Sequence, residues 1–260
     1  IALGIEPTGL ARGAMDVADE GKDNNAFLAA RGQVVVHAEE WSGKGSDIFA
    51  SVERSFDIAD ELGIFDWQYD ADGLGADVRG NARVINARRA EKRQSPHNVS
   101  AFRGSAGVAR PRGQDVAGRY NEDFFQNLKA QSWWSLRRRC YATYRAVKHG
   151  DAFNPDDIIS FDSKALSKPT PRAPYGVLSK LCIELSQPTY RKTETGKIVV
   201  EKAPDGARSP NLGDGVMILF GSAPRTAMVI SEEAKKAVQE LWGELPISSL
   251  GYAARPRPKP

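Results

Sequence analysis

The chain has 260 residues, of which 41% are hydrophobic and 27% charged, an ordinary composition for a globular protein large enough to bury a core. It has no run of about 18 or more apolar residues, and no basic segment followed by an apolar one at its start. The sequence therefore predicts neither a membrane span nor a signal peptide. Two cysteines, Cys140 and Cys182, are too few for a disulfide framework or a zinc site, and we expect both to be reduced, buried thiols of a cytosolic protein.

The net charge of +3 is unevenly distributed along the chain. Residues 1–78 carry 5 Lys and Arg against 16 Asp and Glu, a net charge of −11, whereas residues 79–119 carry 10 against 2, a net charge of +8. An acidic segment followed by an arginine-rich one indicates a protein that binds cations in one place and a polyanion beside it. A solvated basic face explains the charge equally well, so charge alone leaves both interpretations open.

The first part of the chain alternates strand and helix patterns. In chain order, the expected elements are a strand at 13–18, two strands within 26–41, a helix at 46–63, a strand at 65–71, a basic helix at 75–93 and a strand at 98–104. The strand pair turns near Gly32, and the first helix has Ser46 as its N-cap and Gly63 as its C-terminal stop.

The second part is mostly helical. In chain order, we expect a mobile basic loop at 106–119, a long helix at 122–149, a shorter helix at 174–186, a hairpin at 189–202, helices at 211–222 and 231–243, and a disordered tail at 251–260. Asn121 caps the long helix, Gly150 stops it, and the hairpin turns at Thr195 and Gly196. The order predicts one α/β domain over residues 1–260, with a mixed sheet covered by helices.

Several common kinds of site are absent from the sequence. No glycine-rich loop ends in Lys-Ser or Lys-Thr, and the glycines after Tyr69 lack dinucleotide spacing, so neither an ATP site of that type nor a dinucleotide site is expected. His37, His97 and His149 are scattered without a nucleophile motif, and we assign them no catalytic role.

Three aspartates stand out by their positions. Asp16 lies in an apolar strand, where an unpaired charge would be costly to bury, Asp70 ends a strand on its polar side, and Asp214 begins an apolar helix. Carboxylates from two strand ends and a helix start suit a site for Mg²⁺ or Mn²⁺, in which two ions can promote phosphodiester hydrolysis. Taken singly, the three are better explained as a salt-bridge partner, a turn residue and a helix-terminal charge. Taken together with the arginine-rich segment after Asp70, both explanations are equally good, and the residues alone do not decide.

Five segments resemble, in family order, the nuclease domain of the large terminase subunit of tailed bacteriophages, nearest its P22-like group. The segments are residues 15–27, 69–86, 101–105, 118–139 and 209–220. The resemblance extends over roughly residues 13–220. It implies an RNase H-like fold, with a central mixed β-sheet flanked by helices. It also implies a metal-dependent endonuclease that cleaves concatemeric viral double-stranded DNA during genome packaging.

The resemblance assigns metal ligands to individual positions. Asp16 matches the first-strand ligand, Asp70 the second and Asp214 the third, and together they are expected to hold two Mg²⁺ or Mn²⁺ ions. Asp23 matches an auxiliary position, whereas Asp72 matches no ligand and is expected to be a turn residue or a nearby charge. Where the family commonly has alanines around the third aspartate, this chain has Gly213 and Gly215, which should loosen the helix start by about 1 kcal/mol each.

The arginine-rich segment is expected to contact DNA phosphates without reading bases. The candidates are Arg79, Arg83, Arg88, Arg89, Arg103, Arg110 and Arg112. Adjacent Trp133 and Trp134 are expected to pack in the core rather than to stack on bases.

The resemblance also implies partners and a location. The family carries an N-terminal ATPase domain that this sequence lacks, so we expect a piece of a longer polypeptide that cuts DNA but does not translocate it. The portal protein and the small terminase subunit are expected partners, and the expected location is the host cytoplasm at the procapsid, not the virion structure. Two alternatives remain: another RNase H-like nuclease such as a junction resolvase, and a non-catalytic docking module for portal or small terminase.

Overall fold

The structure is a computed structural model that describes residues 3–17, 24–43, 47–73, 75–171, 173–201 and 209–221. All of these residues belong to one compact unit, Ile1–Pro224, and residues 225–260 form a second unit that lies outside the description. The helix expected at 231–243, the tail at 251–260 and Asp23 therefore also lie outside the described residues. Among the described residues, every helix is too short or too polar to span a bilayer.

A six-stranded mixed sheet forms the centre of the unit, with strand order β5-β4-β1-β2-β3-β6. Its strands are β1 (Ala11–Asp16), β2 (Asn24–Arg31), β3 (Val34–Ser42), β4 (Asp66–Asp70), β5 (Asn98–Phe102) and β6 (Ser160–Phe161). β1, β2 and β3 are antiparallel neighbours, whereas β4 is parallel to both β1 and β5, and β6 is parallel to β3. The carboxyl ends of β1, β3, β4 and β5 therefore meet at one edge of the sheet.

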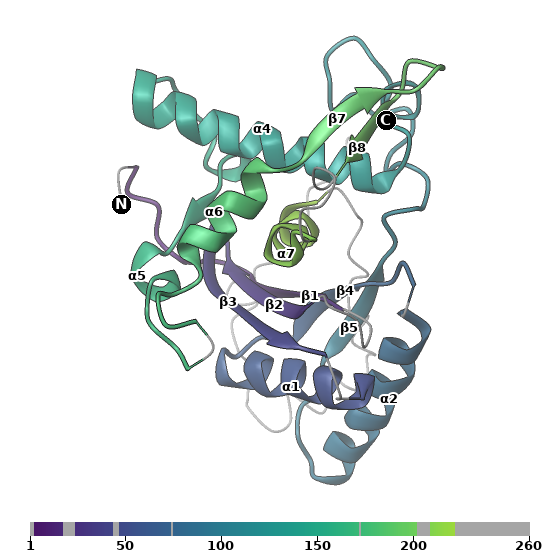
Figure 1. Cartoon of the computed structure of the whole chain (residues 1–260), viewed down its shortest axis with the longest axis vertical. Coiled ribbons are helices and arrows are strands. Elements are labelled where there is room, and N and C mark those ends of the chain that lie inside the picture. Colours follow the sequence, from purple (N-terminus) through teal and green to yellow (C-terminus); the bar gives the residue numbers. More distant parts are fainter. Residues whose placement is uncertain are drawn as a thin grey trace, which may run out of the picture. The chain divides into compact units, whose positions relative to one another are not determined.

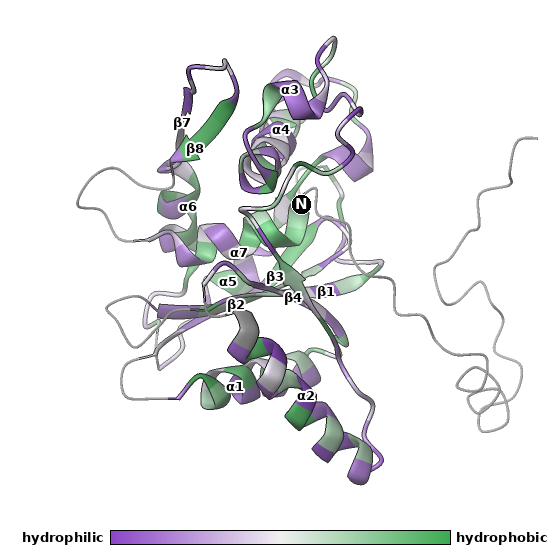
Figure 2. Ribbon diagram, turned by 90° about the vertical axis from the view of Figure 1, so that its right-hand side faces the viewer, coloured by the Kyte–Doolittle hydropathy of each residue, from purple (hydrophilic) through white to green (hydrophobic). Residues whose placement is uncertain are grey.

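Helices cover both faces of this sheet (Figures 1 and 2). Helices α1 (Ile48–Glu61) and α2 (Gly75–Glu91) pack against one face. Helix α7 (Asn211–Phe220) lies on the other face and is contacted from above by α4 (Leu128–His149) and α6 (Leu178–Ser186). Alternation along the strands supplies both cores, because Met15 and Phe27 face α1 while their neighbours Ala14 and Ala26 face α7.

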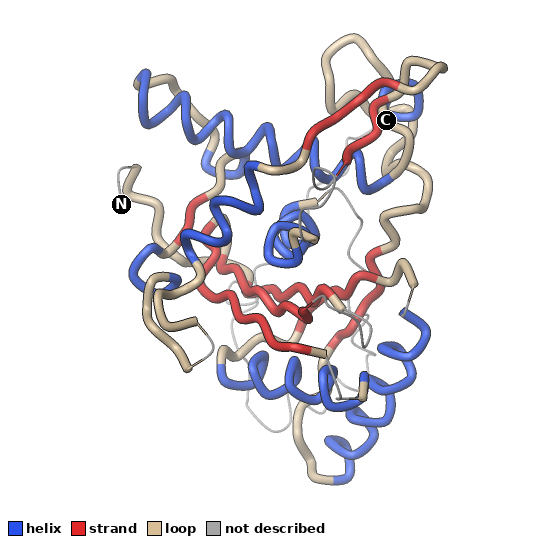
Figure 3. The backbone as a smooth tube through the Cα atoms, in the orientation of Figure 1, coloured by secondary structure: helices blue, strands red, loops and turns tan. Residues whose placement is uncertain are grey.

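The remaining elements are short. They are α3 (Asn121–Phe124), a 3₁₀ turn η1 (Pro155–Asp157), α5 (Ser163–Leu166), β7 (Thr189–Lys192) and β8 (Ile198–Glu201). β7 and β8 form the expected hairpin, a separate two-stranded sheet beside α4 (Figure 3), and Gly196 takes the positive φ of 78° that its turn requires. The predicted strands, the strand pair turning at Gly32, and the mixed sheet covered by helices are all confirmed.

The expected long helix is interrupted. It is divided into α3 and α4, because Phe125 adopts an extended conformation with φ −109° and ψ 141° and bridges to Ile198 of the hairpin. Helix α4 then starts afresh, with the Asn127 side chain accepting the Ala130 amide at 2.9 Å, and it ends at Gly150 as predicted. The N-cap of α1 is Asp47, whose carboxylate accepts the amides of Phe49 and Ala50, rather than Ser46, which lies outside the described residues.

Two further expectations need correction. Cys140 and Cys182 are both free thiols, but only Cys140 is partly buried and Cys182 is exposed.

The basic loop at 106–119 contains no helix or strand, as expected, but it is anchored rather than loose. The Gln131 side chain on α4 bonds both the N–H and the C=O of Ala109, and the Asn121 amide bonds the C=O of Arg110. Trp133 packs in the core, and Trp134 packs against Phe124 and Phe125, as predicted.

Candidate metal centre

Asp16 and Asp70 lie side by side at the carboxyl edge of the sheet. Met15 of β1 pairs with Tyr69 of β4 in parallel, so the next position of the register puts Asp16 beside Asp70. Both side chains point to the α7 face, because Ala14, two residues before Asp16, packs in the core on that face. Both aspartates are buried, with 8% of each residue exposed. Rigid strand ends therefore hold two carboxylates on one face of the sheet.

Asp214 comes to the same face from above, in the first turn of α7. It is fully buried, and α7 contacts β1, β2 and β4. The helix lies unusually close to the sheet, since a Cβ added at Gly215 would collide with the Leu28 side chain of β2. Gly215 therefore allows the close approach that brings Asp214 down onto the strands, and this explains one of the two glycines where alanine was the family expectation.

Two charged side chains, Lys129 and Glu184, lie near the start of α7. The Lys129 ammonium group on α4 lies 3.8 Å from Asp214 Oδ1. Glu184 on α6 is buried, and its Oε2 accepts the Gly213 amide at 3.0 Å. Burial raises the pKa of Glu184, while the Gly213 amide and the Lys180 ammonium group oppose that rise. Neither Lys129 nor Glu184 was a candidate in the sequence.

The donor set suits a hard divalent cation. Asp16, Asp70 and Asp214 offer only carboxylate oxygens, which Mg²⁺ and Mn²⁺ prefer. Across the described ranges, no three His, Cys, Asp or Glu side chains are gathered tightly enough to form a metal cluster. Three carboxylates repel one another, which favours their separation, whereas a bound divalent cation would draw them together. The three aspartates share a face and an edge, and their role as ligands stays a prediction.

Three solved structures that this chain resembles in both fold and sequence come from bacterial virus Sf6. The nuclease domain of the large terminase subunit gp2 of bacterial virus Sf6 is 31% identical to this chain at a TM-score of 0.71, and the match covers 86% of this chain and 92% of the Sf6 chain. With the same coverage, a point mutant of the Sf6 domain with calcium is 29% identical at a TM-score of 0.71. Another, with manganese and beta-thujaplicinol, is 31% identical at 0.70. No protein-family model and no curated protein sequence matches the chain.

The chain belongs to the family of nuclease domains of phage large terminase subunits. Its identity to the Sf6 domain, over nearly the whole of that domain, decides the assignment and confirms the resemblance seen in the sequence. The central mixed sheet with helices on both faces is RNase H-like, as that resemblance implied.

In this terminase nuclease domain, Asp72 has a structural role as a hydrogen-bond acceptor. Its Oδ2 accepts the Ser105 amide at 2.8 Å and its Oδ1 accepts the Ser105 hydroxyl at 2.7 Å, which ties the segment after β4 to the segment after β5. Its own amide donates to Asp70 Oδ1 at 3.0 Å. Although only one residue separates the two carboxylates, Asp70 faces the candidate site and Asp72 links two loops.

Three of the candidate arginines gather near this edge. Burial raises the pKa of Tyr69 of β4. The positive charges of Arg79, Arg103 and Arg83 oppose that rise. Arg79 and Arg83 are exposed on α2, and Arg103 directly follows β5, beside the residues that follow Asp70. Tyr69 and α2 belong to the face opposite α7, so Arg79 and Arg83 act near the end of β4 from the side of the sheet opposite the aspartates.

The other four arginines are engaged elsewhere. Arg89 is buried, and its guanidinium forms two bonds to Asp60 of α1, at 2.5 and 2.9 Å, so contrary to expectation it is not available to bind phosphate. Arg88 lies 5.1 Å from the Phe49 ring centroid, at the far end of α2. Arg110 and Arg112 are 71% and 80% exposed, and each forms an ion pair at 2.9 Å, with Asp115 and Glu122 respectively.

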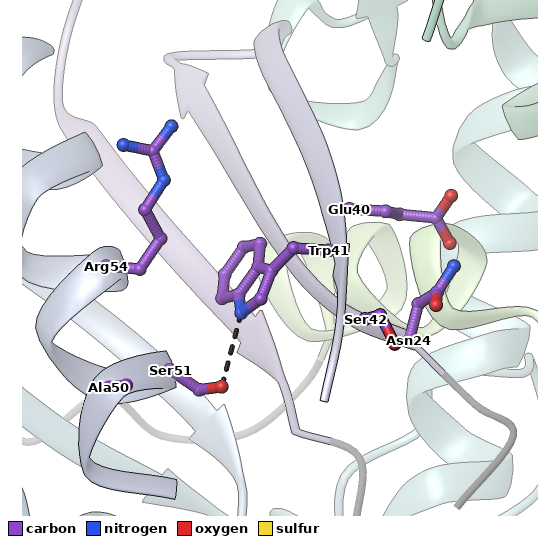
Figure 4. A pocket seen from close by; sticks show the side chains of 7 residues that line it. All are labelled: Asn24, Glu40, Trp41, Ser42, Ala50, Ser51 and Arg54. Carbon is purple, nitrogen blue, oxygen red and sulfur yellow. Dashed lines mark hydrogen bonds between the residues drawn. The ribbon is translucent and has the colours of Figure 1, made fainter. Parts of the chain in front are cut away.

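A hollow lies at the same carboxyl edge, between β3 and α1. Figure 4 shows Trp41 of β3 pointing toward α1, where its indole N–H donates to Ser51 Oγ at 3.2 Å, while Glu40 points to the opposite face. Glu40 pairs in register with Ala26, and Ala26 pairs with Asp16, so Glu40 lies on the aspartate face two strands from Asp16. The acidic character of this face therefore extends beyond the three predicted ligands.

One signal in the sequence could have found Glu184. It follows Leu181 by three residues on α6, at the spacing that faces a core, and a carboxylate there requires a buried partner. Lys129 gives no such signal, because its proximity to Asp214 depends on how α4 packs against α7.

Proposed function

We propose that this domain is a metal-dependent endonuclease that cuts concatemeric viral double-stranded DNA during genome packaging. In this proposal Asp16, Asp70 and Asp214 hold two Mg²⁺ or Mn²⁺ ions, with Asp23 as an auxiliary ligand. The observation that carries it is the arrangement of three buried carboxylates, from two parallel strand ends and one helix start, on one face of the sheet. Its membership of the terminase nuclease family supports the proposal, as do the solved structures of a mutant Sf6 domain with calcium and with manganese.

The chain's own residues provide position and charge. A bound pair of divalent ions would supply an activated water and stabilise the leaving oxygen of the phosphodiester. Asp16 and Asp70 are fixed by adjacent strands, and Asp214 is fixed by a helix packed on them, so little side-chain entropy remains to be lost when they bind a cation. The Lys129 ammonium group lies 3.8 Å from Asp214 Oδ1 and partly offsets the negative charge gathered on this face.

Phosphate contacts are proposed for the exposed arginines around the site. Arg79, Arg83 and Arg103 are the strongest candidates, because they are exposed and their charges act on Tyr69, which precedes Asp70 at the end of β4. Arg110, Arg112 and Arg88 are weaker candidates, because each already contacts a carboxylate or a ring. Contacts of this kind position the duplex backbone without selecting a sequence.

The wider setting follows from the family and is proposed with it. Residues 1–260 act as one nuclease domain, joined in the full polypeptide to an ATPase domain, and the portal protein and small terminase subunit are its partners. The site of action is the host cytoplasm at the procapsid, and the domain is not a structural part of the virion.

The test is plasmid cleavage by the purified domain in Mn²⁺, in Mg²⁺ and in EDTA. Asp16→Asn, Asp70→Asn and Asp214→Asn each remove a charged ligand, and we expect cleavage to fall by at least about a thousandfold while circular dichroism shows an intact fold. Asp72→Asn is the matched control, because an asparagine oxygen can still accept the Ser105 amide, and it should cut within a few-fold of wild type.

Full activity in Asp16→Asn or Asp70→Asn would refute the metal-site assignment. Cleavage that persists in EDTA would refute metal dependence. A strong preference for branched over linear DNA would favour a junction resolvase instead, so both substrates are included. Binding of portal or small terminase without any metal-dependent cleavage would favour a docking module.

A further inference from the structure

Helix α7 begins without a cap of its own. The residue at its N-cap position is Pro210, and in the part of the chain that the structure describes no side chain from the residues next to the helix start accepts its first amides. These amides are buried, because every residue of α7 is buried. A buried amide without an acceptor is costly, so the start of α7 depends on a partner from elsewhere in the chain.

That partner is Glu184, which α6 brings to the start of α7. Its Oε2 accepts the Gly213 amide at 3.0 Å, and the Leu212 amide also interacts with the carboxylate. Its residue is only 5% exposed, so water competes little for this bond. Since Gly213 directly precedes Asp214, the bond fixes the backbone one residue before the predicted metal ligand.

Glu184 is itself held by a lysine that reaches the sheet. The Lys180 ammonium group lies 3.5 Å from Glu184 Oε1, one turn earlier on α6, and it also forms an ion pair with Glu40 of β3. Glu40 lies on the same sheet face as Asp16, across β2. The Glu40–Lys180–Glu184 chain thus links β3, two strands from Asp16, to α6, whose Glu184 bonds the start of α7.

We propose that Glu184 is a positioning residue that holds the first turn of α7, and so Asp214, in the orientation required to bind the metal, with Lys180 keeping the Glu184 carboxylate in place. This proposal rests on the proposed metal site. The carboxylate acts through the Gly213 amide and touches neither substrate nor metal. Glycine at 213 makes such support necessary, because glycine at a helix start has more conformational freedom than alanine.

The experiment measures Mn²⁺ affinity directly, by electron paramagnetic resonance of free Mn²⁺, in wild type, Glu184→Ala, Glu184→Gln and Asp214→Asn, with the fold checked by circular dichroism. We expect Glu184→Ala to bind Mn²⁺ about tenfold more weakly, because it leaves the Gly213 amide without its acceptor. Glu184→Gln retains an acceptor oxygen and should stay within about threefold of wild type. In cleavage assays, the Mn²⁺ concentration giving half-maximal rate should rise in Glu184→Ala, while the rate at saturating Mn²⁺ changes less.

Two further variants keep the proposal testable if Glu184→Ala does not fold. Glu184→Asp shortens the side chain so that it no longer reaches the Gly213 amide from the same backbone position, and we expect binding about three- to tenfold weaker. Lys180→Met removes a half-exposed ammonium group and should weaken binding about two- to threefold.

The outcomes separate this proposal from the one beneath it. Unchanged Mn²⁺ affinity in Glu184→Asp and in a folded Glu184→Ala, with Asp214→Asn impaired, would overturn the positioning role and leave the metal site standing. Wild-type affinity in Asp214→Asn would overturn the metal site itself. Equal losses in Glu184→Gln and Glu184→Ala would show that the hydrogen bond to Gly213 is not what matters, and would also overturn the proposal.

Discussion

The two faces of the sheet are built from the same strands but differ in their side chains: one carries large aromatic residues, and the three aspartates lie on the other. On the α1 and α2 face the side chains are large, and Trp67 lies edge-on to both Phe27 and Phe56, at centroid distances of 5.8 and 5.4 Å. The polar groups beside Trp67 form a network, in which the Trp67 indole donates to His97 Nδ1 at 3.1 Å and His97 Nε2 donates to Asp60 at 2.9 Å. Burial lowers the pKa of His97, in keeping with this neutral form.

The α7 face carries the acids and several small side chains. Ala14, Ala26 and Ala30 face α7 together with the larger Leu28, and the carboxylates of Asp16 and Asp70 extend from the ends of β1 and β4. Small residues let the α7 backbone lie close to the sheet, which brings Asp214 within reach of the strand ends but buries less apolar surface per residue. The aromatic face thus offsets the free energy that buried charges cost on the other face.

The largest test of this division removes an aromatic anchor. Trp67→Ala deletes a fully buried indole and leaves His97 Nδ1 without its donor, so the free energy of unfolding should fall by about 3–5 kcal/mol. Chemical denaturation followed by circular dichroism measures that loss. Mn²⁺ affinity of the protein that remains folded should be nearly unchanged. A large loss of affinity with little loss of stability would contradict the division.

A smaller effect is expected from filling the space beneath α7. In Gly215→Ala, the new methyl group collides with Leu28, and the free energy of unfolding should fall by about 1–3 kcal/mol, together with Mn²⁺ affinity. Adding Leu28→Ala should recover part of both losses in a double-mutant cycle. Gly80→Ala is the control, because nothing lies within 4 Å of a Cβ there, and it should stabilise α2 by up to about 1 kcal/mol. A neutral Gly215→Ala would mean that the close approach of α7 is not needed.

The smallest effects should separate two arginines of one helix. Arg89→Ala removes the paired bonds to Asp60 and should lower the free energy of unfolding by about 1–2 kcal/mol, without changing DNA affinity. Arg83→Ala should leave stability within about 0.5 kcal/mol and weaken DNA binding, with a shallower salt dependence. Fluorescence anisotropy at several salt concentrations measures the DNA affinity of both variants and its salt dependence. Chemical denaturation measures their free energies of unfolding. Equal DNA affinities in the two variants would return this part of α2 to the role of a solvated basic face.

Elements governed by local pattern could be predicted from the sequence. Alternation along Trp67 and Tyr69 placed Asp70 on the opposite side, and the parallel register then set it beside Asp16. Gly150 and Gly196 take positive φ values of 71° and 78°, and they end a helix and turn a hairpin where expected.

Features that depend on contacts between distant segments could not be predicted in this way. The break between α3 and α4 depends on Phe125 bridging to Ile198, which lies far along the chain. Arg89 looked like any other arginine of a basic helix until α1 brought Asp60 to it. Composition shows where charge is abundant, but only packing shows which charges are already neutralised.

The tie between Asp72 and Ser105 has a consequence for folding accuracy. Residues 70 and 72 share a parity, so a slip of β4 by two positions would keep its apolar side chains on the correct face and present Asp72 where Asp70 belongs. Hydrophobic patterning cannot distinguish these two alignments. The bonds from Ser105 favour one of them, because they form only when Asp72 lies past the end of the strand. Ser105, which follows β5, thus stabilises the register of β4 that places Asp70 at the strand end.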